Sequence, residues 1–166
     1  MTTGIRSCDA CRAALAPDDV FCPVCGRLSR PEVHIPCEHH PDTAAAAVCV
    51  VCGRPVCGRC AHAVQGATVC DRPDHDTVHA QWRVVEEVAD PFAADLLVRN
   101  LSLNGIPAQA FDHKAFAART GLDERSRVRV YVHAEHLAAA TALLDRLEIR
   151  MNNGTSLPEH ASKKGH

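Results

Sequence analysis

Cysteine and histidine side chains dominate the chemistry that this sequence can perform. Ten cysteines occur among 166 residues, and eight of them form four Cys-x-x-Cys pairs. A tight turn lets both members of such a pair point at one metal ion, and two pairs complete a tetrahedral zinc site. This spacing favours metal ligation over disulfides, above all in a reducing compartment.

The first two pairs predict a metal site near the N-terminus. Ten residues separate them, enough for a short hairpin, and the four ligands are Cys8, Cys11, Cys22 and Cys25. The spacing resembles a small zinc ribbon over residues 1–29. Iron is the alternative metal, because Cys-Pro-x-Cys-Gly turns also occur in rubredoxin-like sites. Those sites have a compact aromatic core, whereas this module has only Phe21, so we favour zinc.

A second stretch, residues 37–80, carries eight further candidate ligands. Only four residues separate its second and third pairs, too few for these two pairs to share an ion comfortably. Interleaving the pairs avoids this problem. We therefore predict two zinc sites, one with Cys37, His40, Cys57 and Cys60, the other with Cys49, Cys52, Cys70 and His75.

Two of these histidines have neighbours that could replace them. His39 competes with His40, although Cys-x-x-His fits the turn geometry better than Cys-x-His. His79 competes with His75, because the gap after Cys70 is unusual with either residue. His62 is expected to be a solvent-exposed histidine and no ligand.

The order of ligands in residues 37–80 resembles bacterial B-box-like zinc fingers with interleaved sites. The matching residues are Cys37, His40, Pro41, Cys49, Cys52, Gly53, Arg54, Pro55, Val56, Cys57 and Cys60. The resemblance implies an interaction module. An enzyme is not expected, because a catalytic zinc keeps an open position for water and here eight ligands fill two closed sites.

Regular hydrophobic periods begin after the cysteines end, in residues 81–150. We expect a strand at 83–88, then a helix with Asp90 as N-cap and Pro91 as its first residue. Its apolar face carries Phe92, Leu96, Leu97 and Leu101. Strands at 107–111 and 127–132 and a helix at 134–149 follow.

This βαββα order predicts a ferredoxin-like, split-βαβ arrangement in which the third strand lies between the other two and is antiparallel to both. Residues 127–132 alternate strictly, so we expect helices on one sheet face. The opposite face, with Arg127, Arg129 and Tyr131, is expected to be open.

The same region resembles the putative prokaryotic signal-transducing proteins, which are related in fold to PII (GlnB-like) proteins. The resemblance rests on Val84-Val85, the stretch 90–97, Asn104-Gly105-Ile106-Pro107-Ala108, and the last strand and helix. It implies a regulatory domain whose loop, residues 112–124, contacts targets. We find no glycine-rich phosphate cradle, so nucleotide binding is not inferred.

The remaining segments are a predicted linker at 30–36 and a predicted disordered tail at 151–166. The sequence shows no signal peptide and no apolar run near the ~20 residues of a membrane span, so a cytoplasmic location is expected. The net charge of −2 gives no global case for nucleic acid.

Together these features predict a non-enzymatic, zinc-binding adaptor or regulatory protein with three zinc ions per chain. It would act through protein–protein interaction or signal transduction, with a protein partner that the sequence does not identify. We see no small-molecule substrate and no membrane role. The alternative is a nucleic-acid or ribosome-associated zinc-ribbon protein that contacts phosphates through Arg6, Arg12, Arg27 and Arg30.

Overall fold

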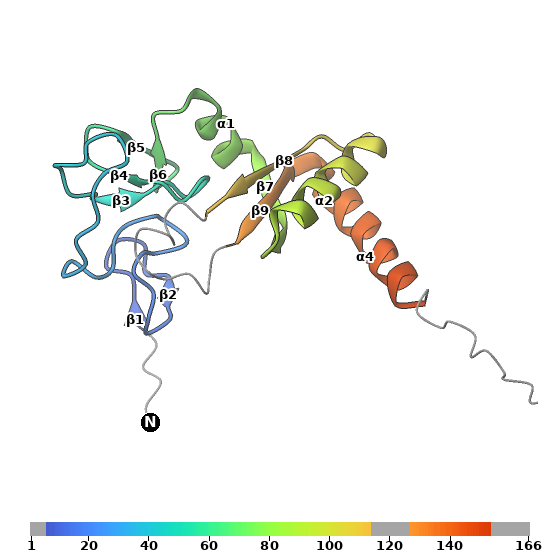
Figure 1. The fold of residues 1–166 in the computed structure, drawn as a ribbon, viewed down its shortest axis with the longest axis horizontal. Helices are drawn as coiled ribbons and strands as arrows, with labels where there is room; N and C mark the ends of the chain where they lie inside the picture. The colour runs from blue at the N-terminus through green and yellow to red at the C-terminus, as the bar shows by residue number, and fades with distance from the viewer. Residues whose placement is uncertain (1–5, 114–126, 154–166) are drawn as a thin grey trace, which may run out of the picture.

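The structure is a computed structural model that describes residues 6–113 and 127–153. Small cysteine-rich modules with short two-stranded hairpins come first, and a mixed α+β region with a three-stranded antiparallel sheet follows (Figure 1). This order confirms the fold class at that level of detail. No helix within the described residues is both long enough and apolar enough to cross a bilayer.

The N-terminal module contains one short hairpin. Strand β1 (Arg6–Ser7) pairs with β2 (Ala14–Leu15), and an isolated bridge joins Phe21 to Leu28. Its small core consists of Leu15 and the cysteines themselves, with Ala13 packed against them. So little apolar surface cannot stabilise a fold alone, which is the expected condition of a metal-dependent module.

The central module contains two hairpins and one helix. Strands β3 (Ala47–Val48) and β4 (Pro55–Val56) form the first hairpin, and β5 (Ala61–Val64) and β6 (Ala67–Cys70) the second. Helix α1 (Pro73–Gln81) follows and was not anticipated. The residues that favour this helix lie within it. Pro73 suits the first helical position, and the acidic residues Asp74 and Asp76 stabilise the first turn.

The N-terminal and central modules are joined by backbone hydrogen bonds. The Val48 amide donates to the Gly26 carbonyl at 2.8 Å, and the Thr68 amide donates to the Cys25 carbonyl at 2.9 Å. Gly26 has a φ of +76°, and a Cβ there would lie 2.2 Å from the Val48 oxygen. Residues 30–36 also pack into this contact, since Ile35 is buried with Val48.

The α+β region has the predicted order of elements. They are β7 (Trp82–Val88), α2 (Pro91–Leu103), β8 (Ala108–Asp112), β9 (Val128–His133), the short 3-10 helix η2 (Ala134–His136) and α4 (Leu137–Asn153). The sheet order is β7-β9-β8 with both pairs antiparallel, which confirms the central position of the third strand. Asp90 caps α2 by accepting the Phe92 amide at 3.1 Å. Helix α4 includes residues 151–153, which were predicted to belong to the disordered tail. Most of the predicted loop 112–124, and residues 154–166 of the predicted tail, lie outside the described residues.

One face of the sheet is covered by the two helices, as expected. Val128, Val130 and Val132 of β9 lie in a core with Leu101 of α2 and Leu144 of α4. The helices lie on the side of the sheet away from the cysteine-rich modules (Figure 1).

The prediction that the opposite sheet face is open was wrong. Tyr131 is only 6% exposed and belongs to the core of the central module, where it packs with Val51 and Val78. Phe111 of the neighbouring strand meets the Tyr131 ring edge-on at a centroid distance of 5.6 Å. Two aromatic rings side by side offer too much apolar surface to be left in water, and the central module covers them.

The predicted apolar face of α2 was also partly wrong. Ala94 and Leu101 are fully buried, and Leu97 is partly buried against them. Phe92 and Leu96, however, are 73% and 52% exposed. The helix packs through the face around Ala94, whose small side chain permits a close approach to the sheet, and this turns Phe92 and Leu96 away from the core.

Candidate metal centres

All twelve predicted ligands gather into three groups of four. The groups are Cys8, Cys11, Cys22, Cys25; Cys37, His40, Cys57, Cys60; and Cys49, Cys52, Cys70, His75. Within each group the candidate donor atoms lie within 4.8 Å of one another. The pairs are therefore interleaved in space as the spacing predicted, while metal binding at them stays a prediction.

The distances within the groups fit tetrahedral zinc. Zn–S bonds of about 2.3 Å and Zn–N bonds of about 2.05 Å place neighbouring sulfurs about 3.8 Å apart, and sulfur and nitrogen about 3.6 Å apart. In the N-terminal group, Cys8 and Cys25 Sγ are 3.6 Å apart and Cys11 and Cys22 Sγ are 3.5 Å apart. No aromatic side chain lies in the core around these sulfurs, and this agrees better with zinc than with a rubredoxin-like iron site.

The first central group is organised around His40. Its Nδ1 atom lies 3.9, 3.5 and 3.2 Å from the sulfurs of Cys37, Cys57 and Cys60. His39, the alternative ligand, is exposed and outside the group.

The second central group is the most enclosed, because all four of its side chains are buried. His75 Nδ1 lies 3.5 Å from Cys49 Sγ and 3.1 Å from Cys70 Sγ, and the sulfurs of Cys52 and Cys70 are 4.0 Å apart. His75 occupies the first turn of α1, which is why this unexpected helix matters for the site. His79, one turn later, is outside the group, and His62 is exposed beside Asp76.

Tight backbone turns position the ligands and favour thiolates. The amide of Cys11 lowers the pKa of Cys8 to about 7, and the amide of Arg59 lowers the pKa of Cys57 to about 6. Hydrogen bonds from Cys52 and Cys70 lower the pKa of Cys49 far below its usual range. Burial raises the pKa of Cys25 and that of Cys60 to about 12, and the hydrogen bond with Cys49 raises the pKa of Cys52 above its usual range. Each group thus contains one thiol that ionises readily and another that would give up its proton only to a bound metal ion.

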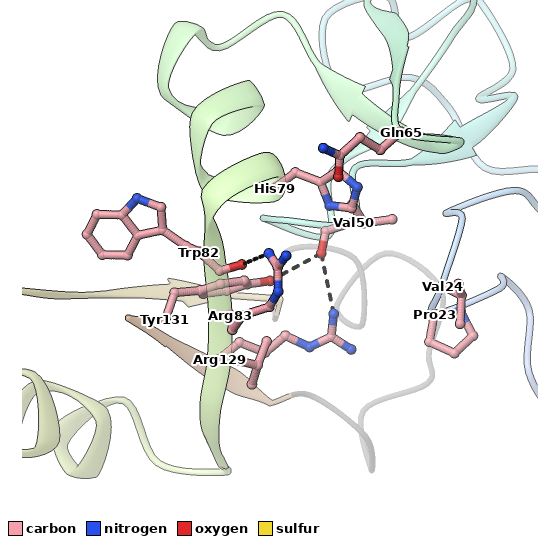
Figure 2. A pocket seen from close by; sticks show the side chains of 10 residues that line it. Pro23, Val24, Val50, Gln65, His79, Trp82, Arg83, Arg129 and Tyr131 are labelled. Carbon is pink, nitrogen blue, oxygen red and sulfur yellow. Dashed lines mark hydrogen bonds between the residues drawn. The ribbon is translucent and has the colours of Figure 1, made fainter. Parts of the chain in front are cut away.

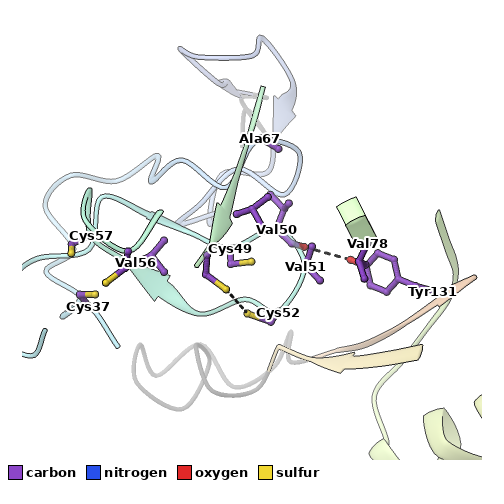
Figure 3. Close-up of a cluster of buried hydrophobic side chains, with 13 residues drawn as sticks. Cys37, Cys49, Val50, Val51, Cys52, Val56, Cys57, Ala67, Val78 and Tyr131 are labelled. Atoms are coloured by element: carbon purple, nitrogen blue, oxygen red, sulfur yellow. Dashed lines mark hydrogen bonds between the residues drawn. The ribbon is translucent and has the colours of Figure 1, made fainter. Parts of the chain in front are cut away.

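The sheet contacts the backbone between Cys49 and Cys52 directly. The Val50 carbonyl accepts from Arg129 Nη1 at 3.3 Å and from the Tyr131 hydroxyl at 3.5 Å. The Val51 carbonyl accepts from His113 Nε2 at 2.8 Å. Figure 3 shows Val50, Val51 and Tyr131 in one cluster with the Val50–Tyr131 bond.

Aromatic rings of the sheet also pack against one of the candidate ligands. The Phe111 ring meets the His75 imidazole edge-on at a centroid distance of 5.2 Å and meets Tyr131 on its other side. These sheet residues were not predicted from the sequence to be parts of the site. The signal that could have found them is the presence of large aromatic residues, Phe111 and Tyr131, in two of the predicted strands.

The four arginines of the nucleic-acid alternative differ in their surroundings. Arg6 Nη2 donates to the Asp19 carbonyl at 2.9 Å, and Arg30 donates to the Pro17 carbonyl. Both guanidinium groups are therefore hydrogen-bonded to backbone carbonyls of the N-terminal module. Arg12 and Arg27 are exposed.

A groove of about 300 Å³ lies where the three parts of the chain meet. Pro23 and Val24 of the N-terminal module face Arg83 and Arg129 of the sheet across it, with His79 of α1 near its rim (Figure 2). Val24 is 57% exposed. The groove therefore combines apolar surface with basic side chains.

Comparison of the chain with protein-family models, with curated proteins and with solved structures gave no match. The resemblances to zinc ribbons, B-box-like fingers and PII-like proteins accordingly rest on the residues quoted for them.

Proposed function

We propose that this protein is a non-enzymatic, zinc-binding adaptor or regulatory protein that carries three zinc ions per chain. The observation that carries the proposal is the convergence of twelve cysteine and histidine side chains into three four-donor groups. Four protein donors per ion leave no position for a catalytic water. Zinc at such closed sites contributes folding free energy and fixes the shape of the surrounding surface.

The finer assignments belong to the same proposal. We assign the N-terminal module to the zinc-ribbon type and the central module to the B-box-like type, on the order of their ligands. We assign the α+β region to a ferredoxin-like, PII-related signalling type. The β7-β9-β8 strand order supports the last assignment.

The groove between the three parts is the surface that we propose for a protein partner. Arg83 is exposed there and donates to the carbonyls of Ala80 and Trp82, and the apolar side chains of Val24 and Val84 line the same groove. Basic and apolar groups in one groove complement a peptide segment in which an acidic residue neighbours an apolar one.

Selection from a random peptide-display library with the zinc-loaded full chain tests this function. We expect enriched peptides to carry an acidic residue beside an apolar one. Their affinity should fall at least tenfold for Arg83→Glu, because the substitution reverses the charge of the groove. Leu96→Asp, on the far side of the sheet, is the matched control and should bind as the wild type does. Failure to enrich peptides, or affinity unchanged by Arg83→Glu, contradicts the proposed surface.

Nucleic-acid association stays an alternative proposal based on the exposed Arg12 and Arg27. Phosphate contacts of this kind weaken steeply with salt. A gel-shift titration with mixed RNA and DNA at low salt decides between the two, and we expect no shift.

A further inference from the structure

Helix α2 is apolar on two opposite faces. Five large apolar side chains are exposed within the described residues, and three of them belong to this helix: Phe92 (73% exposed), Leu96 (52%) and Leu103 (75%). At 100° per residue, these three lie within about 40° of one another. They point away from Ala94 and Leu101, which face the sheet. A helix that is apolar on both faces is normally packed on both faces.

The exposed side chains form a regular stripe. Phe92, Leu96, Arg99 and Leu103 follow one another at intervals of four, three and four residues. This is the spacing of a helix seam that packs against another helix. Arg99 interrupts the apolar stripe at its middle, but its aliphatic stem can continue the apolar surface while the guanidinium reaches the edge.

The charges beside the stripe are arranged symmetrically about its centre. Asp95 and Arg99 are one turn apart, and the point midway between them, at Leu97, lies within half a residue of the midpoint of Phe92–Leu103, which falls between Leu97 and Val98. In an antiparallel pair of α2 helices related by a two-fold axis through this point, each Arg99 faces the other chain's Asp95. Both ion pairs form at once, and Phe92 meets Leu103 at each end. Such self-complementarity is the requirement for an isologous interface.

We propose that the α2 stripe is a homodimerisation surface, and that its occupant is the α2 helix of a second copy of this chain. Helix α2 lies on the side of the sheet away from the cysteine-rich modules (Figure 1). None of the stripe residues lines the groove, so dimerisation leaves both the modules and the groove accessible. One helix pair buries less than the ~1,200 Å² of stable complexes. The dimer is therefore weak, with a dissociation constant on the order of 10–100 μM.

Sedimentation equilibrium of the zinc-loaded full chain between 5 and 500 μM tests the proposal. We expect a monomer–dimer equilibrium, and Leu96→Asp should weaken it at least tenfold. Ala63→Asp is the matched control, because it adds the same charge at an exposed position of β5 in the central module. Zinc content and circular dichroism verify that each variant is folded. A wild-type chain that stays monomeric at 500 μM overturns the proposal, as does a dimer that Leu96→Asp leaves intact.

A charge exchange then tests the two-fold pairing itself. Arg99→Asp places two acidic residues opposite each other at both crossings, and Asp95→Arg places two basic ones there, so each variant alone should dimerise at least threefold more weakly. An equimolar mixture of the two restores both ion pairs and should dimerise as well as the wild type. Rescue in the mixture shows that the charges at positions 95 and 99 lie against the partner helix. A mixture that stays as weak as its components contradicts the register and overturns the proposal.

Discussion

The N-terminal metal site and the site around Cys49 offer similar ligands in very different surroundings. Cys11 of the N-terminal site is half-buried, and the core around it contains little beyond Leu15. The Cys49 site has four buried ligands and a shell that reaches from the central hairpins through α1 to the sheet residue Tyr131. Metal binding would therefore stabilise only the local hairpin at the N-terminal site. At the Cys49 site it would also support the packing of the central hairpins and α1 against the sheet.

The Cys49 site connects the cysteine-rich modules to the sheet. Val50 and Val51, which lie between two ligands, accept hydrogen bonds from Arg129, Tyr131 and His113. Zinc bound at this site would fix the turn that presents these carbonyls and would thereby position the sheet indirectly. The N-terminal site has no comparable contact with the sheet among the described residues.

The largest effect is expected for Cys70→Ser, which removes a buried ligand of the Cys49 site. We expect a loss of more than about 4 kcal/mol in the free energy of unfolding, because both the metal and the sheet contact depend on this ligand. Hydrogen exchange should show deprotection of β9 as well as of the central hairpins. If β9 kept its wild-type protection, the proposed link between the Cys49 site and the sheet would be contradicted.

Cys11→Ser removes a ligand of the N-terminal site and provides the matched comparison. We expect faster exchange in β1 and β2, and one zinc fewer per chain. The amides of β9 should keep their wild-type protection, since the site organises only its own hairpin. Faster exchange in β9 as well would show that the N-terminal site, like the Cys49 site, supports the sheet.

Gly26→Ala tests the backbone contact between the N-terminal and central modules. The new Cβ would lie 2.2 Å from the Val48 oxygen, whereas at Gly66, which also has a positive φ, a Cβ would meet nothing within 4 Å. Both substitutions cost about 1 kcal/mol for the left-handed backbone. Gly26→Ala should cost about 2 kcal/mol more in denaturant unfolding. Equal costs at the two glycines would show that the modules are not in tight contact.

The smallest effect is a pH dependence that arises from His113. Burial, and next the charge of Arg129, lower the pKa of His113 to about 4. The unfolded chain, with a histidine pKa of about 6.5, binds a proton that the folded chain does not. The free energy of unfolding should therefore fall by about 1 kcal/mol between pH 7 and pH 5.5.

His113→Gln is the control for this dependence, because glutamine keeps a donor for the Val51 carbonyl but does not titrate. Its stability should fall less than that of the wild type over the same pH range, as measured by urea unfolding with zinc present. Identical slopes for the two proteins would assign the pH dependence to other groups.

Much of this structure could be predicted from residue spacing. The grouping of ligands followed from the number of residues between pairs, since four residues are too few for Cys49-x-x-Cys52 and Cys57-x-x-Cys60 to share one ion comfortably. The strand order followed from βα connectivity, and Asp90-Pro91 marked the start of α2. These features depend on residues that are close together in the chain, so they can be predicted from residue types and spacing.

The packing between modules could not be predicted in the same way. Alternation in β9 correctly gave the face of Val128, Val130 and Val132, but it gave no sign that a second surface covers Tyr131. Periodicity likewise placed Phe92 on an apolar face without showing which apolar face of α2 meets the sheet. Both questions depend on contacts between segments far apart in the chain, and one sequence carries no record of those.

Native mass spectrometry of the full chain tests the central claim most directly, because it counts bound metal ions and detects disulfides in one spectrum. We predict three zinc ions per chain with all ten cysteines reduced. Stepwise chelation should release the N-terminal zinc, with its half-buried Cys11, before the zinc of the buried Cys49 site. A chain that contains one zinc or none, with disulfides between the cysteines, would contradict the account.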